Sequence, residues 1–246
     1  MKIFIGLVLT FLGLSFSINA QDHVLDHESA SDSVKMVLTI IPFPNNYYRS
    51  EIDRSLAKNE NIDFNSLRDG MKKELDRQLF MILKDDFTIN SLLKNDTEDD
   101  RELLDYIYYS TASSYTNLET GDKVERGLIN NGQIKEATIQ EGQRYMKTVI
   151  HNPSFFVTVE EQVPSDLYLF IGELDILLPQ TIDEKKSNRN IYVHFTLYNK
   201  KGELIDSGMI TQVISERKCK SIKDVSHNGF APIAYQFKNR FSTLQE

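Results

Sequence analysis

The stretch from Ile191 to Ile214, IYVHFTLYNKKGELIDSGMITQVI, decides the predicted fold of this chain. Its first arm alternates in character, because Val193, Phe195 and Leu197 fall on one side while Tyr192, His194, Thr196 and Tyr198 fall on the other. This period of two is typical of a strand with two different faces. The polar residues 199–202 then lead into a second arm, residues 203–214. We therefore predict a C-terminal β-hairpin.

Helical patterns flank this hairpin in the sequence. Residues 63–83 carry apolar side chains at intervals of three and four: Leu67, Met71, Leu75, Leu79, Ile82 and Leu83. Asp63 or Asn65 is expected to cap this segment. Charged residues, Asp76 among them, are expected on the opposite side. A one-sided apolar stripe of this kind predicts a helix that lies on a sheet. A last helix is expected from about Phe230, packed through Ile233, Phe237 and Phe241.

The other segments complete the predicted topology. We expect strands at residues 34–43, 87–93, 155–159 and 167–178, and a helix through Tyr108 that begins at a Thr97–Asp100 capping box. The predicted fold class is therefore α/β (α+β): a mixed sheet with a long amphipathic helix and a C-terminal helix packed on it, and a C-terminal hairpin.

The first residues of the chain predict its destination. Lys2, the apolar run 3–18 and the small residue Ala20 have the layout of a secretory signal peptide, with cleavage near Ala20. An uncleaved N-terminal anchor is the alternative. After cleavage we expect a periplasmic or secreted protein without stable membrane insertion, which begins with a disordered acidic leader at 21–33 and continues as a single α/β domain over 34–246.

Composition excludes several classes of function. The net charge is -8 and the only cysteine is Cys219, so nucleic-acid binding is not expected and no intramolecular disulfide can form. The chain has no nucleophile elbow, no zinc-type histidine pair with a glutamate between, and no phosphate-binding glycine loop. We therefore expect neither a cofactor nor a metal, and favour a protein that is not an enzyme.

An exposed excursion is predicted at about 111–143, where apolar residues become sparse and glycines frequent. It contains an Asn-Gly hairpin signal, Asn131-Gly132, flanked by isoleucines. A long segment of this kind in a compact domain is often functional. Together with the loop after Phe43, it supplies the predicted partner-binding residues: Tyr47, Tyr48, Ile129, Asn131, Gly132 and Ile134.

Weak catalytic candidates lie on two of the predicted strands. Glu173 and Asp175 share a face of the 167–178 strand, and paired carboxylates can hydrolyse glycosidic bonds. His194 lies among aromatic residues on the less apolar face of its strand. For the carboxylates the competing interpretation is a strand that emerges into solvent, and for His194 it is a hydrogen-bonded structural histidine.

Two phrases of the chain carry a family resemblance. They are residues 165–174, SDLYLFIGEL, and residues 193–205, VHFTLYNKKGELI, followed by Ser207-Gly208. Together they resemble the α/β domain of the curli-secretion lipoprotein and penicillin-binding-protein activator group. The chain departs from those lipoproteins because no cysteine lies at the cleavage site. Its composition also resembles uncharacterised exported proteins of Bacteroidota-type bacteria.

The resemblance implies an envelope protein that binds other envelope components, whether protein or polymer. We therefore expect a non-catalytic exported protein that binds a component of the cell envelope. A small envelope hydrolase with paired carboxylates and a structural subunit of a surface assembly are the alternatives, and the sequence leaves the oligomeric state open.

Overall fold

The computed structural model describes residues 35–94, 97–117, 127–130, 133–136, 144–178 and 187–245. The predicted signal peptide, the acidic leader and the Asn131-Gly132 turn lie outside these residues. The described part of the chain belongs to one compact unit, Lys35–Glu246. None of its helices is long and apolar enough to cross a membrane.

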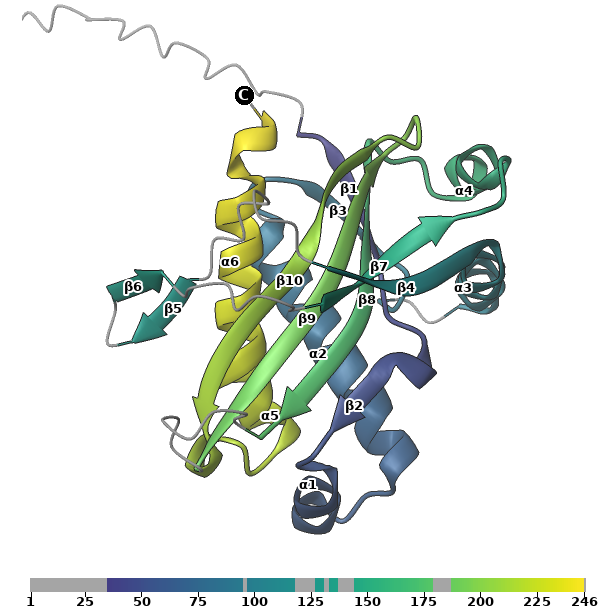
Figure 1. Ribbon diagram of the computed structural model, residues 1–246. Helices are drawn as coiled ribbons and strands as arrows, with labels where there is room; N and C mark the ends of the chain where they lie inside the picture. The colour runs from purple at the N-terminus through teal and green to yellow at the C-terminus, as the bar shows by residue number, and fades with distance from the viewer. Residues whose placement is uncertain are drawn as a thin grey trace, which may run out of the picture. The chain divides into compact units, whose positions relative to one another are not determined.

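A mixed sheet forms the centre of the unit (Figure 1). Its strand order is β10-β9-β8-β1-β3, and β2 pairs with the second half of β8. β8 runs parallel to β1 and β2 and antiparallel to β9. The bounds are β1 (Val37–Ile41), β2 (Tyr48–Ser50), β3 (Thr88–Ser91), β8 (Leu167–Leu177), β9 (Asn188–Asn199) and β10 (Leu204–Ser215). The β9–β10 pairing confirms the predicted hairpin.

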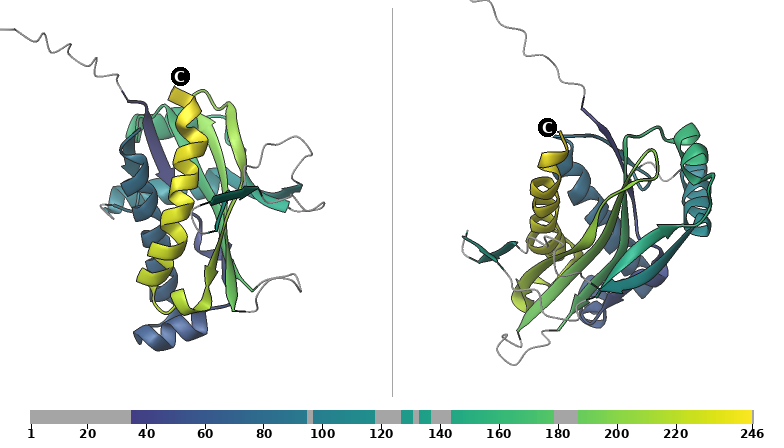
Figure 2. Two further views of the ribbon diagram at one scale, coloured as in Figure 1. Left: turned by 90° about the vertical axis from the view of Figure 1, so that its left-hand side faces the viewer. Right: turned by 45° about the horizontal axis from the view of Figure 1, so that its top comes forward.

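Helices α2 and α6 cover one face of the sheet (Figure 2, left). The Asp63 side chain caps α2 by accepting the N–H groups of Asn65 and Ser66, as predicted. The expected stripe packs on the sheet, with Ile82 only partly buried. The helices on this side are α1 (Asp53–Glu60), α2 (Phe64–Leu83), α5 (Ile222–Val225), a π-helical turn (Ser226–Phe230) and α6 (Ala231–Phe241). The predicted fold class is therefore confirmed.

The opposite face carries two helices and a two-stranded ribbon: α3 (Glu98–Ser110), α4 (Phe155–Gln162), β4 (Thr111–Asn117) and β7 (Arg144–Ile150). The Thr97–Asp100 capping box at the start of α3 is confirmed. The strand predicted at 155–159 is wrong, because these residues begin α4. Phe155 and Val159, one helical turn apart, are both fully buried against this face. A short apolar run does not distinguish a buried strand from a helix.

The range 111–143 contains more regular structure than a continuous loop. Its first residues form β4, which pairs antiparallel with β7. Further on, β5 (Gly127–Asn130) pairs with β6 (Gln133–Glu136), and Ile129 lies opposite Ile134. This pairing agrees with the predicted hairpin.

Asp76 lies in an environment that the helical pattern did not predict. The sequence places it on the exposed side of α2, yet it is 7% exposed. The Ser91 hydroxyl donates to one carboxylate oxygen at 2.6 Å, while the other oxygen has no hydrogen-bond partner among the described residues. Burial raises the pKa of Asp76 to about 6. Asp76 also lines a small cavity with Lys72 and Phe43.

Replacing Asp76 with Asn should stabilise the protein above about pH 6, by up to about 3 kcal/mol. The folded-state pKa exceeds the unfolded one of about 3.8, so the wild type loses stability as pH rises through this interval. The difference in unfolding free energy between variant and wild type should be small near pH 4 and largest near pH 8. Urea titrations at the two pH values measure it, and a pH-independent difference would contradict the assignment.

Candidate functional site

A β-bulge in β8 creates the polar cluster of this protein. Leu167, Leu169 and Ile171 face the α2 and α6 layer, and strict alternation would send residues 173 and 175 into the same core. The pairing with β9 instead shifts register between Ile171 and Glu173. After the shift, Leu174 and Ile176 occupy that core. Glu173 and Asp175 are thereby turned to the opposite face.

Gly172 is the additional residue at this bulge. A Cβ atom there would lie 3.2 Å from the carbonyl oxygen of Met146 on β7. This is shorter than ordinary van der Waals contact, so β7 passes over β8 at a distance that glycine accommodates best. The bulge therefore lets the ribbon approach the two carboxylates.

Glu173 is buried beneath the ribbon, with 6% of its surface exposed. The Tyr115 hydroxyl lies 2.8 and 2.7 Å from its two carboxylate oxygens, to which it donates its proton. Burial raises the pKa of Glu173, and the Tyr115 hydrogen bond opposes that rise. Tyr115 itself is half-exposed, so its hydroxyl is held from inside while part of its ring faces solvent.

Asp175 is paired with a residue of a neighbouring strand. Arg49 lies opposite Asp175 in the β2–β8 pairing, and its Nε and Nη2 donate to the two carboxylate oxygens at 3.1 and 2.5 Å. Burial raises the pKa of Asp175, and the Arg49 guanidinium opposes that rise. The Asp175 side chain is 4% exposed while that of Arg49 is 58% exposed. The pair thus joins a buried anion to a surface cation.

His194 lies opposite Glu173 on β9 and completes the cluster. Its Nδ1 accepts the backbone N–H of Met146 at 2.7 Å, so the proton of the neutral ring resides on Nε2. Nε2 lies 3.8 Å from Glu173 Oε2 and from Asp175 Oδ2 and makes no hydrogen bond in the described structure. Burial, with a smaller contribution from Arg49, lowers the pKa of His194 to about 3. The ring is therefore neutral at physiological pH.

The same face of β9 holds β7 in place. The Thr148 N–H donates to the Thr196 hydroxyl at 3.0 Å, and the Tyr198 hydroxyl donates to the Thr148 carbonyl at 2.9 Å. With the His194 contact, three alternate side chains of β9 bind the backbone of β7. The hydrogen bond from Met146 agrees with the interpretation of His194 as a hydrogen-bonded structural histidine.

The cluster has the composition of a metal site, and its chemistry can be tested on the structure. One ligand atom each from Glu173, Asp175 and His194 lies within 4.8 Å of the others. To bind a cation through Nε2, a neutral histidine must carry its proton on Nδ1, where the Met146 N–H already points. The histidine therefore does not fit as a metal ligand.

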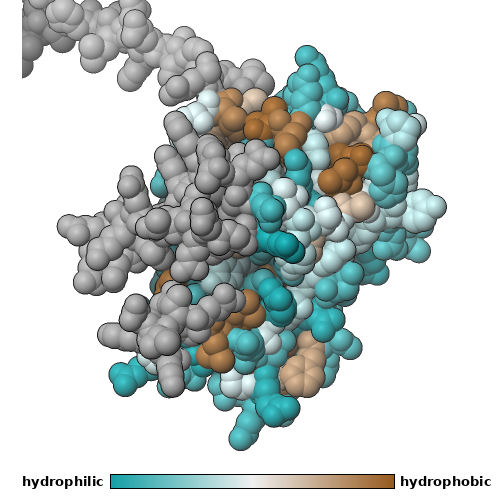
Figure 3. Space-filling model, viewed as in Figure 1, coloured by the Kyte–Doolittle hydropathy of each residue, from teal (hydrophilic) through white to brown (hydrophobic). Residues whose placement is uncertain are grey.

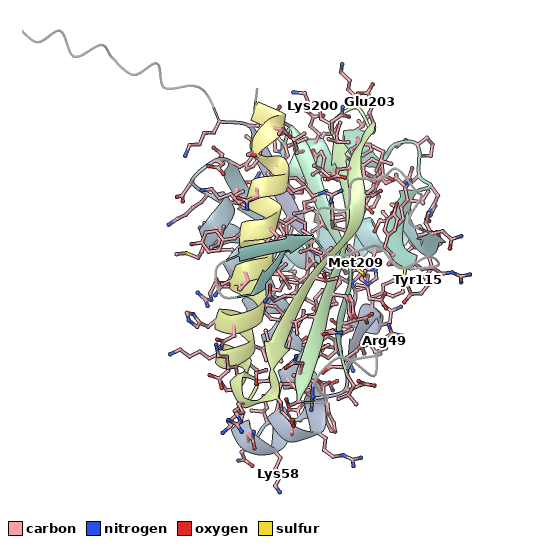
Figure 4. All side chains as sticks on the ribbon, turned by 60° about the vertical axis from the view of Figure 1, so that its left-hand side comes forward. Arg49, Lys58, Tyr115, Lys200, Glu203 and Met209 are labelled. Carbon is pink, nitrogen blue, oxygen red and sulfur yellow. The ribbon has the colours of Figure 1, made fainter. Side chains whose placement is uncertain are left out.

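The bulge brings together the three weak catalytic candidates, Glu173, Asp175 and His194. Two residues that the sequence analysis missed join them: Arg49 and Tyr115, which are labelled in Figure 4. Arg49 lies in a three-residue strand whose sequence is typical of a loop, and Tyr115 lies in a polar segment. Neither has a recognisable motif. Only the β2–β8 and β4–β7 pairings bring them to the carboxylates.

The remaining candidate residues take no part in the polar cluster. Tyr47 ends a short 3-10 helix, and Tyr48 begins β2, with its hydroxyl donating to Asp53 at 2.7 Å. Ile129 and Ile134 pair on β5 and β6, while Asn131 and Gly132 lie outside the described residues. Cys219 is buried in the core and donates to the Ser215 carbonyl, and burial raises the pKa of its thiol to about 12.

Comparisons with known proteins yield little. No family model matches the chain, and no curated protein does. Among solved structures, the chain is similar to the hypothetical protein CT253 from Chlamydia trachomatis, with 8% sequence identity and a TM-score of 0.37. The match covers 86% of this chain and 96% of that one.

Proposed function

We propose that this chain is a non-catalytic exported protein that binds a component of the cell envelope through a surface centred on Arg49 and Tyr115. The observation that carries the proposal is that Glu173 and Asp175 hold Tyr115 and Arg49 in place through hydrogen bonds. Both carboxylates accept hydrogen bonds: Glu173 from the single Tyr115 hydroxyl proton, and Asp175 from two nitrogens of Arg49. The buried acids therefore act as anchors for two residues that face solvent.

The same contacts disfavour the hydrolase alternative. A general acid or a nucleophile must reach the substrate atom directly or through one water molecule. Glu173 and Asp175 are 6% and 3% exposed, and the ribbon and Arg49 lie between them and solvent. The cavity lined by Asp76 includes neither residue.

Arg49 and Tyr115 suit a binding role for a physical reason. Arginine and tyrosine contribute a large share of the free energy at protein interfaces. Here each is held by a buried carboxylate, so less side-chain entropy is lost when a partner binds. The signal-peptide pattern and the family resemblance support an envelope component as that partner.

Affinity capture from the native envelope tests the proposal. The mature chain, its Arg49→Gln variant and its Lys58→Gln variant would serve as baits; Lys58 is an exposed lysine of α1 that serves as the charge-matched control. We expect the wild type and Lys58→Gln to enrich the same component, and Arg49→Gln to recover about tenfold less. Capture of no envelope component, or equal capture by Arg49→Gln, would overturn the proposal. Release of soluble fragments from purified envelope polymer would favour the hydrolase.

A further inference from the structure

The ribbon has one edge whose backbone groups point away from its partner strand. Among the described strands, β4 pairs with β7 alone. The His151 N–H donates to the Ser110 carbonyl, which sets the phase of the antiparallel ladder. Residues 112, 114 and 116 therefore bond β7, while the backbone groups of Ser113 and Tyr115 point to the other side. The same phase directs the Met146 and Thr148 N–H groups toward β9, as observed.

The outward-pointing backbone groups of the two ribbon edges differ in their hydrogen-bond partners. Side chains of β9 occupy the β7 edge, through His194, Thr196 and Tyr198. The β4 edge, TASSYTN at residues 111–117, has no proline and no charged residue, although these are usual means of protecting an edge strand. Four of its seven residues are exposed. This edge is therefore a suitable template for another strand.

We propose that the free edge of β4 accepts an extended segment of a partner protein as an added strand, and that this segment places an acidic side chain on Arg49. The inference rests on the proposed function and specifies its partner as a polypeptide. Main-chain hydrogen bonds to Ser113 and Tyr115 supply affinity, and the contact with Arg49 supplies specificity.

Arg49 is oriented for this contact. Its Nε and Nη2 are bound to Asp175, and its Nη1 has no hydrogen-bond partner in the described part of the chain. Tyr115 on β4 and Arg49 lie on the same side of the sheet (Figure 4). A carboxylate is one of the acceptors that a guanidinium fork binds strongly, through two parallel hydrogen bonds.

The hydrophilic character of the surface agrees with recognition of a peptide through its backbone and its charge. On the face shown in Figure 3, hydrophilic residues predominate and hydrophobic ones occupy separate small areas outside the grey atoms. A second copy is a poorer occupant than an acidic peptide. Its own β4 contains no carboxylate that could bind Arg49.

Selection of linear peptides tests the proposal. A displayed library of random decapeptides would be selected on the mature chain, and the enriched peptides synthesised with Asp or Glu intact and replaced by Asn or Gln. We expect enriched peptides to carry an acidic residue whose replacement weakens binding about tenfold. Hydrogen exchange of the wild-type chain should show slower exchange of the amides in 111–117 when peptide is bound.

Two substitutions at one position separate backbone from side-chain effects. Ser113→Pro removes an N–H that does not bond β7, so the ribbon should remain folded while peptide binding weakens about tenfold. Ser113→Val keeps the N–H and should bind as the wild type does. Unchanged peptide binding by Ser113→Pro, unchanged exchange in 111–117, or dimers of the wild type that Ser113→Pro dissociates would overturn the proposal. Envelope capture that depends on Arg49 but not on Ser113 would leave the proposed function intact and reject only the added strand.

Discussion

Insertion of one alanine between Glu173 and Leu174 should leave the chain unable to fold cooperatively. With the extra residue, strict alternation after Glu173 sends Asp175 into the core beneath α2 and α6 and turns Leu174 and Ile176 out of it. This register buries an unpaired carboxylate and removes two apolar side chains from the core, each at a cost of several kcal/mol. That cost approaches the total stability of a domain, which is about 5–15 kcal/mol.

Gly172→Ala is the matched control, because it keeps the residue count and therefore the bulge. Its Cβ would approach the Met146 carbonyl to 3.2 Å, so we expect a loss of about 1–3 kcal/mol with the fold retained. Urea unfolding followed by circular dichroism and near-ultraviolet spectra distinguishes the two variants. An insertion variant with the stability of the wild type would show that the register of β8 is not fixed beyond Gly172.

Phe195→Ala should destabilise the protein by about 3–5 kcal/mol. The Phe195 side chain is fully buried on β9 and meets the rings of Phe237 and Phe241 of α6 edge-on, at centroid distances of 5.0 and 6.1 Å. Its removal leaves a cavity between the hairpin and α6 that the surrounding β-strand cannot fill. The midpoint of urea unfolding should fall with little change in slope.

A double-mutant cycle with Phe237→Ala isolates the aromatic pair. We expect a coupling energy of about 0.5–1.5 kcal/mol, the usual value for edge-to-face rings. Phe195→Leu is the milder control, with a smaller loss because most of the volume is kept. Additive losses in the cycle would show that α6 does not pack on β9 through these rings.

The elements that were predicted well are those with long, one-sided patterns. The α2 stripe, the α6 stripe and the β9–β10 hairpin each repeat their signal over many residues. Short or polar segments gave weaker signals. Residues 155–159 were misassigned, β7 was not predicted, and Asp76 was placed in solvent, because these outcomes depend on what packs against each segment.

The polar cluster was foreseen only in part. Sequence alternation placed Glu173 and Asp175 on a common face, which the structure confirms, but it could not tell which face. His194 was expected among aromatic residues, and Tyr115 does meet its ring edge-on at 6.4 Å. The link from Asp175 to Arg49 joins residues 126 positions apart, and no local pattern encodes such a contact.

By itself, the sequence determined the class of fold, the two packing helices and the hairpin, because hydrophobic periodicity directly reflects which side of an element is buried. It also predicted export, through a segment that lies outside the described residues. The tertiary structure alone decided that a bulge at Gly172 turns two carboxylates away from the core, and that Arg49 and Tyr115 come to meet them. The physical reason is that a bulge is a property of two paired strands, and burial is a property of everything that covers them.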